Sequence, residues 1–215
     1  MKTFPPLSVF NGMKIRKRLC ISRSVDRYME EMAMKKKIIS IVLAIWVLMI
    51  VLSVVFLFLP RTIHLDGVGV KYRLGEENRE LEQMVHINMD GKRYLTTSGD
   101  YIFRGTIDIE GESFPVPEDQ KALEIRFHKG YGSMAYINFG NGKTGIFVYG
   151  TLFVDRAFTK LTIAISEEDS SGEQRSRSWS SEDGLMLSMP ATNRSEAIQL
   201  SNELMETYLG GYTLK

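Results

Sequence analysis

The residues of this sequence best placed for chemistry lie on one predicted strand. Glu124, Arg126 and His128 alternate with apolar residues, so an extended chain places all three on one polar face. A histidine beside a carboxylate can take up and release a proton near neutral pH, which is the chemistry of a general acid–base pair. An exposed patch of charges that pair across neighbouring strands explains the same three residues without any reaction.

Two aromatic residues are candidates for binding rather than for catalysis. Tyr131 stands between Gly130 and Gly132, and these flanking glycines are expected to leave its ring in the open, as in a binding loop. Trp179 is the large aromatic residue of residues 167–183, a polar, serine-rich segment that is predicted to be a mobile loop. The candidate binding residues are therefore Tyr131, His128, Glu124, Arg126 and Trp179.

No motif of a reaction or of a cofactor accompanies these residues. The G-x-S-x-G pattern of a nucleophilic serine is absent from the sequence. Gly142-Lys143-Thr144 lacks the glycine that a phosphate loop requires at position 137, where isoleucine stands. His64, His86 and His128 do not show the H-x-x-x-H spacing of a clustered zinc site. We expect no catalytic residue, no cofactor and no metal, and the short basic stretch near the N-terminus is too little to predict a nucleic-acid partner.

The candidate residues belong to a long series of predicted strands. Apolar and polar residues alternate with a period of two along much of residues 68–165, which is typical of half-buried strands. Asp90-Gly91 and Asn141-Gly142 favour tight hairpin turns. Residues 145–154 are apolar on both faces, which predicts a central strand covered on both sides. Seven or eight strands at this spacing indicate an antiparallel sheet.

An amphipathic helix is predicted near the end of the chain. Asn193 is placed to cap it, with Glu196 three positions later, and Gly210-Gly211 ends it. Apolar residues recur at helical spacing, at Ala197, Leu200, Leu204 and Tyr208, helped by Ile198 and Met205. The predicted fold class is α+β, with a single N-terminal transmembrane helix followed by a β-rich antiparallel sheet domain with one C-terminal amphipathic helix.

The transmembrane helix is predicted at residues 38–59, which are 22 residues without a charge. As a helix they measure about 33 Å, enough to cross a hydrocarbon core of about 30 Å. Residues 1–37 hold ten Lys and Arg residues against three Asp and Glu, whereas the residues after the span carry a net negative charge. Because basic flanks remain in the cytoplasm, we expect a single-pass membrane protein with residues 60–215 outside the cytoplasm.

Residues 38–59 are predicted to be an uncleaved signal-anchor. The apolar core of a cleaved signal peptide has only about 7–15 residues and precedes small residues, whereas Leu57-Phe58-Leu59-Pro60-Arg61 follows here. Residues 1–37 then form a basic cytoplasmic tail, although Met34 and the three lysines after it also suit a translation start. In that case residues 1–33 are a misassigned extension. The lone cysteine, Cys20, lies in this tail, so a disulfide in the outer domain is excluded.

Two hypotheses about function follow. In the first, the outer domain binds a protein or an envelope component in sensing or assembly, without evident catalysis, while residues 38–59 contact the lipid bilayer. In the second, it is a membrane-tethered hydrolase that uses surface carboxylates and His128, which requires a concave pocket that gathers His128, Glu124 and another acid. The small residues Ser40 and Ala44 are typical of associating helices and leave a homo-oligomer open.

Overall fold

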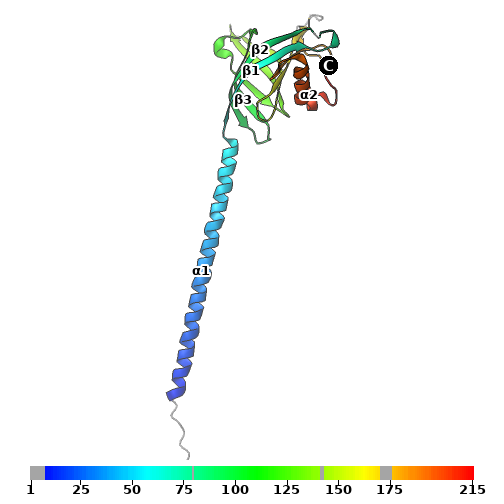
Figure 1. Ribbon diagram of the computed structural model, residues 1–215. Helices are drawn as coiled ribbons and strands as arrows, with labels where there is room; N and C mark the ends of the chain where they lie inside the picture. The colour runs from blue at the N-terminus through cyan, green and yellow to red at the C-terminus, as the bar shows by residue number, and fades with distance from the viewer. Residues whose placement is uncertain (1–7, 79, 141–142, 170–175) are drawn as a thin grey trace, which may run out of the picture. The chain divides into compact units, whose positions relative to one another are not determined.

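The computed structural model describes residues 8–78, 80–140, 143–169 and 176–215. These residues form two compact units, the N-terminal helix and a β-rich unit that starts at Phe58 (Figure 1). Helix α1 runs from Ser8 to Phe58, and its segment Met34–Phe58 is long and apolar enough to cross a membrane. An apolar helix in this position is typical of a membrane anchor or of a signal sequence. The predicted span is thus part of a longer helix that includes most of the basic tail.

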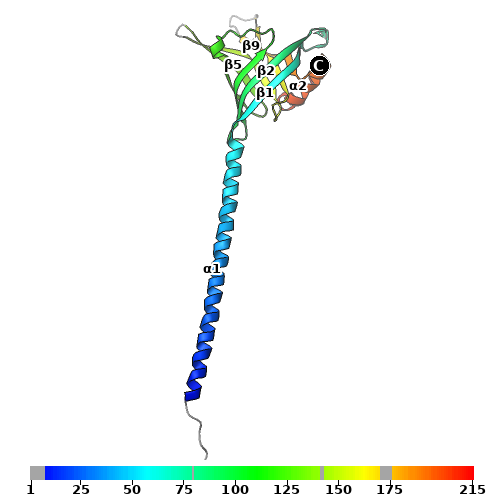
Figure 2. The ribbon, with the colours of Figure 1, turned by 60° about the vertical axis from the view of Figure 1, so that its left-hand side comes forward.

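The β-rich unit is built on one eight-stranded antiparallel sheet, which confirms the prediction of such a sheet. Its strands, in the order β4-β3-β2-β1-β10-β7-β6-β5, follow the chain up and down around a nearly closed barrel (Figure 2). Their bounds are β1 Arg61–Arg73, β2 Glu82–Leu95, β3 Tyr101–Ile109, β4 Leu123–Phe127, β5 Tyr131–Gly140, β6 Lys143–Val154, β7 Leu161–Ile165 and β10 Leu185–Met189. Short 3₁₀ helices, η1 at Glu76–Asn78 and η2 at Glu118–Gln120, lie in two of the connections.

The two edge strands of the sheet, β4 and β5, meet at a two-bond bridge. The backbone N–H of His128 donates to the carbonyl of Tyr131 at 2.9 Å, and the N–H of Tyr131 donates back at 3.2 Å. A Cβ atom at Gly132 would lie 2.6 Å from the carbonyl oxygen of Arg126, so only glycine lets the edges come this close. Gly130 has a φ of 88° and forms the turn. Both glycines therefore have structural reasons to be there.

Strand β2 does not turn at Asp90-Gly91, so the predicted hairpin turn at this dipeptide is wrong. The strand continues to Leu95, and Gly91 lies opposite Gly105 of β3. A Cβ atom at Gly105 would lie 1.9 Å from the carbonyl oxygen of Asp90. Glycine is needed here for close approach of two backbones and not for a positive φ. The turn comes later, at residues 96–100, where Gly99 has a φ of 85°.

The interior of the barrel is filled with apolar side chains from every strand of the sheet. An eight-stranded barrel has an interior just wide enough to be filled in this way. The core of the barrel includes Ile63, Ile87, Phe103, Ile125, Tyr136, Leu152, Ile163 and Leu187.

Helix α2, Arg194–Leu209, packs on the outer face of β1, β10 and β7 (Figure 1). The predicted caps are confirmed, because the side chain of Asn193 accepts the N–H of Glu196 at 2.9 Å and Gly210 has a φ of 60°. The helix buries Ala197, Leu200, Ser201 and Met205. Ala197, Leu200 and Met205 of the predicted apolar face are thus buried, and Leu204 is half-buried. Tyr208, at 46% exposed, is the member of the predicted face that lies outside the core.

A network of four hydroxyl groups lies under α2. Ser201 of the helix is 2.6 Å from the hydroxyl of Tyr72 and 2.8 Å from that of Ser188, and Thr162 lies 3.0 Å from Ser188. All four side chains are buried. Each hydroxyl has a partner within the network, as buried polar groups require. Burial raises the pKa of Tyr72, which stays protonated.

Three further predictions concern loops and strand ends. Within residues 167–183, β8 (Glu167–Asp169) and β9 (Ser176–Ser178) pair as a short hairpin, so the prediction of a loop without strands is wrong there. The turn predicted at Asn141-Gly142 lies outside the described residues. Strand β6 is covered on both faces only in its second half, because Ile146 is 69% exposed while Phe153 is buried.

Replacing Gly105 by alanine tests the close approach of β2 and β3. We expect Gly105→Ala to lower the free energy of unfolding by about 3 kcal/mol, because the new Cβ forces the two backbones apart. The matched control is Gly145→Ala, whose Cβ would meet no atom closer than 4.0 Å. Urea unfolding of both variants measures the difference, and equal midpoints would show that the two strands can separate without cost.

Candidate functional site

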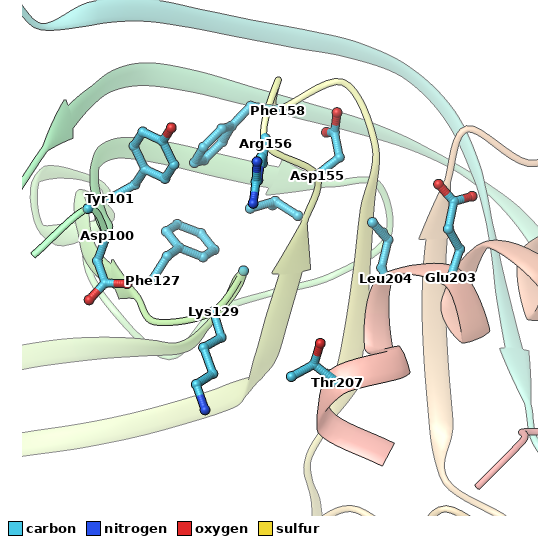
Figure 3. Close-up of a pocket in the computed structure, with 13 residues that line it drawn as sticks. Asp100, Tyr101, Phe127, Lys129, Asp155, Arg156, Phe158, Glu203, Leu204 and Thr207 are labelled. Carbon is cyan, nitrogen blue, oxygen red and sulfur yellow. The ribbon is translucent and has the colours of Figure 1, made fainter. Parts of the chain in front are cut away.

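A cleft of about 480 Å³ lies at the end of the barrel where three turns meet α2 (Figure 3). The turns join β2 to β3, β4 to β5 and β6 to β7, so residues distant in the sequence come together here. The residues that carry the chemistry of the cleft are Asp100, Tyr101, Phe127, Lys129, Asp155, Arg156, Phe158 and Glu203.

Aromatic rings form one side of the cleft (Figure 3). Phe158 is 3% exposed although its backbone has a φ of 59°, an uncommon conformation for a bulky residue. Its ring lies edge-on to Phe127 at 5.3 Å and to Tyr101 at 6.0 Å between centroids. The guanidinium of Arg93 lies 5.2 Å from the Tyr101 ring and 5.4 Å from the Phe158 ring. These contacts hold the β6–β7 turn against the end of the barrel.

The carboxylate of Asp155 organises the same turn. It accepts the backbone N–H groups of Ala157, Thr159 and Lys160 at 3.2, 2.6 and 2.8 Å, and the hydroxyl of Thr159 at 3.0 Å. Burial acts to raise the pKa of Asp155, but these hydrogen bonds outweigh it, so its pKa lies below the ordinary 3.8. Asp155 is thus engaged in holding the turn.

Asp100 pairs with His128 at the rim of the cleft. Nδ1 of His128 lies 3.2 Å from Oδ2 of Asp100, and the hydroxyl of Ser98 donates to the same oxygen at 3.1 Å. The contact with His128 is the main reason why the pKa of Asp100 is lowered. The serine contacts the carboxylate rather than the histidine. A nucleophilic triad needs the histidine between serine and acid, so this trio does not have the order of one.

The remaining charges leave the cleft with two free cations. Glu203 of α2 is bound by Lys160 at 2.8 Å, so all three carboxylates of the cleft are engaged. Lys129 and Arg156 are exposed and have no ion pair among the residues that the structure describes. The cleft can therefore neutralise an anionic group beside its aromatic wall.

The structure does not bring Glu124 and His128 together. Glu124 lies on the outer face of β4, where it accepts Nε of Arg104 at 2.8 Å and Nη2 of Arg126 at 3.2 Å. Arg104 first, and then Arg126, lower the pKa of Glu124. Glu124 and Arg126 therefore belong to an exposed patch of paired charges, as the second interpretation of these residues predicted. His128 contacts a different acid, Asp100.

The two aromatic candidates, Tyr131 and Trp179, do not line the cleft. Both pack against a second cluster of buried apolar side chains, which the sheet and α2 form together. Tyr131 is half-buried, with its ring 5.6 Å from Phe153 and 5.3 Å from Tyr208 between centroids, so it does not stand in the open as expected. Trp179 is half-buried, and a Cβ at Gly184 would lie 2.4 Å from its Nε1, so the ring packs directly over this glycine.

Sequence reasoning missed Lys129, Arg156 and Phe158. A weak sequence signal exists for the β6–β7 turn, which holds Arg156 and Phe158. Asp155 lies shortly before Thr159 and Lys160, a spacing that is typical of turns stabilised by an aspartate. Nothing in the sequence showed that this turn lies beside α2.

The histidines of the barrel each contact an aspartate. His64 lies 2.7 Å from Asp90, and His86 lies 3.4 Å from Asp66. The hydrogen bond with Asp90 is the main cause that raises the pKa of His64 above 6.5. Among the described residues, no group of three or more His, Cys, Asp or Glu side chains is arranged to hold a metal ion.

No protein-family model matches the chain, and no curated protein or solved structure matches it either. Its chemistry is therefore inferred from its own residues.

Removing the Asp155 carboxylate tests its role in forming the cleft. We expect Asp155→Ala to lower the free energy of unfolding by about 2 kcal/mol, because three backbone N–H groups lose their acceptor. Asp119→Ala, at an exposed aspartate outside the cleft, is the matched control and should change stability little. Urea unfolding at neutral pH compares the two variants.

The pH dependence of the stability difference between wild type and Asp155→Ala gives a second measurement. Because the pKa of Asp155 is lowered by folding, its contribution is present above the unfolded value of 3.8 and is lost as pH falls through the folded value. The difference between wild type and Asp155→Ala should therefore shrink well below pH 3.8. A difference that does not depend on pH would contradict this role of the carboxylate.

Proposed function

We propose that the protein is a single-pass, membrane-anchored binding module whose cleft takes an anionic group of a protein or envelope component outside the cytoplasm. The observation that carries this proposal is the charge state of the cleft. Each of its carboxylates is engaged by a partner within the chain, while Lys129 and Arg156 are free to meet a ligand. No reaction is part of the proposal.

The anchor is supported by the length and flanks of α1. Met34–Phe58 has a mean hydropathy of 3.2 over its most apolar window, and none of that window is buried. Lys35, Lys36 and Lys37 lie at its N-terminal side, and the charge balance is positive before the span and negative after it. These features support retention as a signal-anchor with the N-terminus in the cytoplasm.

Binding rather than catalysis is supported by the arrangement of the cleft. Its aromatic side offers apolar surface, and its free cations can pair with a carboxylate or phosphate. A ligand of this kind would be held by charge-assisted hydrogen bonds beside ring contacts. The hydrolase alternative has less support, because the acid–base cluster of His128 and Glu124 is not formed and the His128–Asp100 pair lacks an adjacent nucleophile.

Thiol labelling of intact cells tests the orientation. A cysteine placed at the exposed residue Thr97 in a Cys20→Ser background should react with a membrane-impermeant maleimide. The wild-type chain, whose one cysteine is Cys20, should react only after the membrane is permeabilised. The opposite pattern would reverse the proposed orientation, and a mature chain without residues 1–59 would show that the helix is cleaved.

Binding to anionic polymers tests the cleft. The full chain in lipid nanodiscs is measured against poly-L-glutamate, polyglycerol phosphate and uncharged dextran, so that acidic protein and envelope phosphate are separate arms. We expect Lys129→Asn with Arg156→Gln to weaken binding at least about tenfold, because two charge-assisted contacts are lost. Asparagine is chosen because it tolerates the positive φ of Lys129.

The matched control is Lys92→Gln with Arg61→Gln, which removes two exposed positive charges from β2 and β1, outside the cleft. Equal losses of binding in the control and in the cleft variant would show that binding depends only on net charge. Wild-type protein that binds neither anionic polymer, or binds dextran equally well, would contradict the proposed function.

A further inference from the structure

Among the described residues, two phenol hydroxyls inside the barrel have no hydrogen-bond partner of ordinary geometry. Tyr136 of β5 is 1% exposed and Tyr149 of β6 is 4% exposed, and both belong to the core of the barrel. Buried polar groups are nearly always paired, so each exception needs a physical explanation. Two unpaired donors in neighbouring strands of one interior indicate a place where a polar atom of a ligand can be received.

The side chain that packs against both tyrosines comes from a connection rather than from a strand. Phe114 lies in residues 110–122, which join β3 to β4 and which we call the plug segment. Its ring stacks on Tyr136, with centroids 4.5 Å apart and 25° between planes, and meets Tyr149 edge-on at 5.1 Å. Phe114 is 8% exposed and so fills the space beside the two hydroxyls.

The plug segment is tied to the barrel by few polar contacts. The side chain of Asn138 donates to the carbonyl of Pro115 at 3.2 Å, and Gln120 accepts the backbone N–H of Phe139 at 2.9 Å. Near its start, Glu112 forms an ion pair with Lys71. Glu110, at the start of the segment, also exchanges two hydrogen bonds with the backbone of His86, and Val116 packs on the core. Beyond Glu112 the segment is held by the Phe114 ring, by Val116 and by two hydrogen bonds, so this part can open at lower cost than a strand of the sheet.

Exposed apolar residues lie next to the plug segment. Ile137 and Ile146 are opposite each other in the β5–β6 pair and are 47% and 69% exposed. Phe139, whose backbone contacts the plug segment, is 64% exposed. These side chains alternate with the interior-facing Tyr136, so they lie on the outer face of the barrel and offer an apolar molecule a surface close to the plug segment.

The chemistry around the two tyrosines selects the kind of ligand. Burial, followed by the charge of Asp108, raises the pKa of Tyr136. Burial, followed by the charge of Glu112 and then by a contact of the hydroxyl with the Glu112 carboxylate, raises the pKa of Tyr149. Both phenols stay protonated and can donate. The nearby carboxylates disfavour an anion, and an apolar space the size of one aromatic side chain accepts a benzene-sized ring.

We propose that this end of the barrel binds a small neutral molecule with one aromatic ring, or an alkyl group of similar size, and one hydrogen-bond acceptor. The ring occupies the place of Phe114, and the acceptor receives the hydroxyls of Tyr136 and Tyr149. This site is separate from the cleft that Lys129 and Arg156 line, and it goes beyond the proposed function.

Photolabelling of the full chain in lipid nanodiscs tests the site with 4-azidoacetophenone, a neutral ketone with one ring. On illumination the probe attaches to residues near its ring, and mass spectrometry identifies them. We expect saturable attachment to interior residues of β5, β6 and the plug segment, and we expect excess acetophenone to suppress it. Attachment that acetophenone does not suppress, or that is confined to α1, would overturn the proposal.

Three variants distinguish ligand binding from other reasons for two buried hydroxyls. Phe114→Ala should increase the competed labelling, because it vacates the ring position, whereas Tyr212→Ala, at an exposed tyrosine after α2, should leave it unchanged. Tyr136→Phe should reduce the labelling about three- to tenfold, the effect of losing one hydrogen bond. Without the probe, Tyr136→Phe should unfold at the same temperature as wild type or higher, because an unpaired buried hydroxyl has been removed.

A lower unfolding temperature of Tyr136→Phe, with labelling equal to that of wild type, would show that the hydroxyl is satisfied within the folded chain and would overturn the proposal. Lys129→Asn with Arg156→Gln should not change the labelling. The outcome at this site is therefore independent of the outcome at the cleft.

Discussion

Closure of the sheet is the constraint on which the rest of the structure depends. Eight antiparallel strands bury one face only if the sheet curves until β4 and β5 approach each other. Backbones come close where glycine removes a side chain, at the Gly91–Gly105 pair, at Gly150 and at Gly132. These positions set the curvature, and the curvature in turn decides which turns share an end of the barrel. The cleft and the plug segment both lie at such ends.

The charges of the barrel are mostly satisfied within the barrel. Asp155 is held by backbone N–H groups, Asp100 by His128, and Glu203 by Lys160. A cleft whose carboxylates are engaged and whose Lys129 and Arg156 are free offers positive charge to a ligand. Exposed ion pairs stabilise a protein little. The main consequence of these pairs is that the charges of the cleft left unpaired among the described residues, on Lys129 and Arg156, are positive.

Local patterns predicted local structure well. Alternation located the strands, and the caps of α2 at Asn193 and Gly210 were read from the sequence. Asp90-Gly91 misled because glycine serves both turns and close backbone contacts, and only the partner strand distinguishes the two uses. Tyr131 misled for the same reason, since its neighbouring glycines form the turn and the closure. The cleft could not be predicted, because its turns meet only after the sheet has closed.

The four hydroxyls under α2 have a consequence for how the helix is seated. Ser201 is the one side chain of the helix that joins this network, and it faces Tyr72, Ser188 and Thr162 from the sheet, while the carbonyl of Ala197 also accepts from Tyr72 at 3.4 Å. If the helix shifted by one turn, Ala197 or Met205 would face these hydroxyls. Alanine has no polar side-chain atom and the methionine sulfur is only a weak hydrogen-bond acceptor, so neither replaces the hydroxyl of Ser201. Apolar contacts alone would tolerate such a shift of the helix. The four hydroxyl groups thus fix a single register between α2 and the strands that it covers.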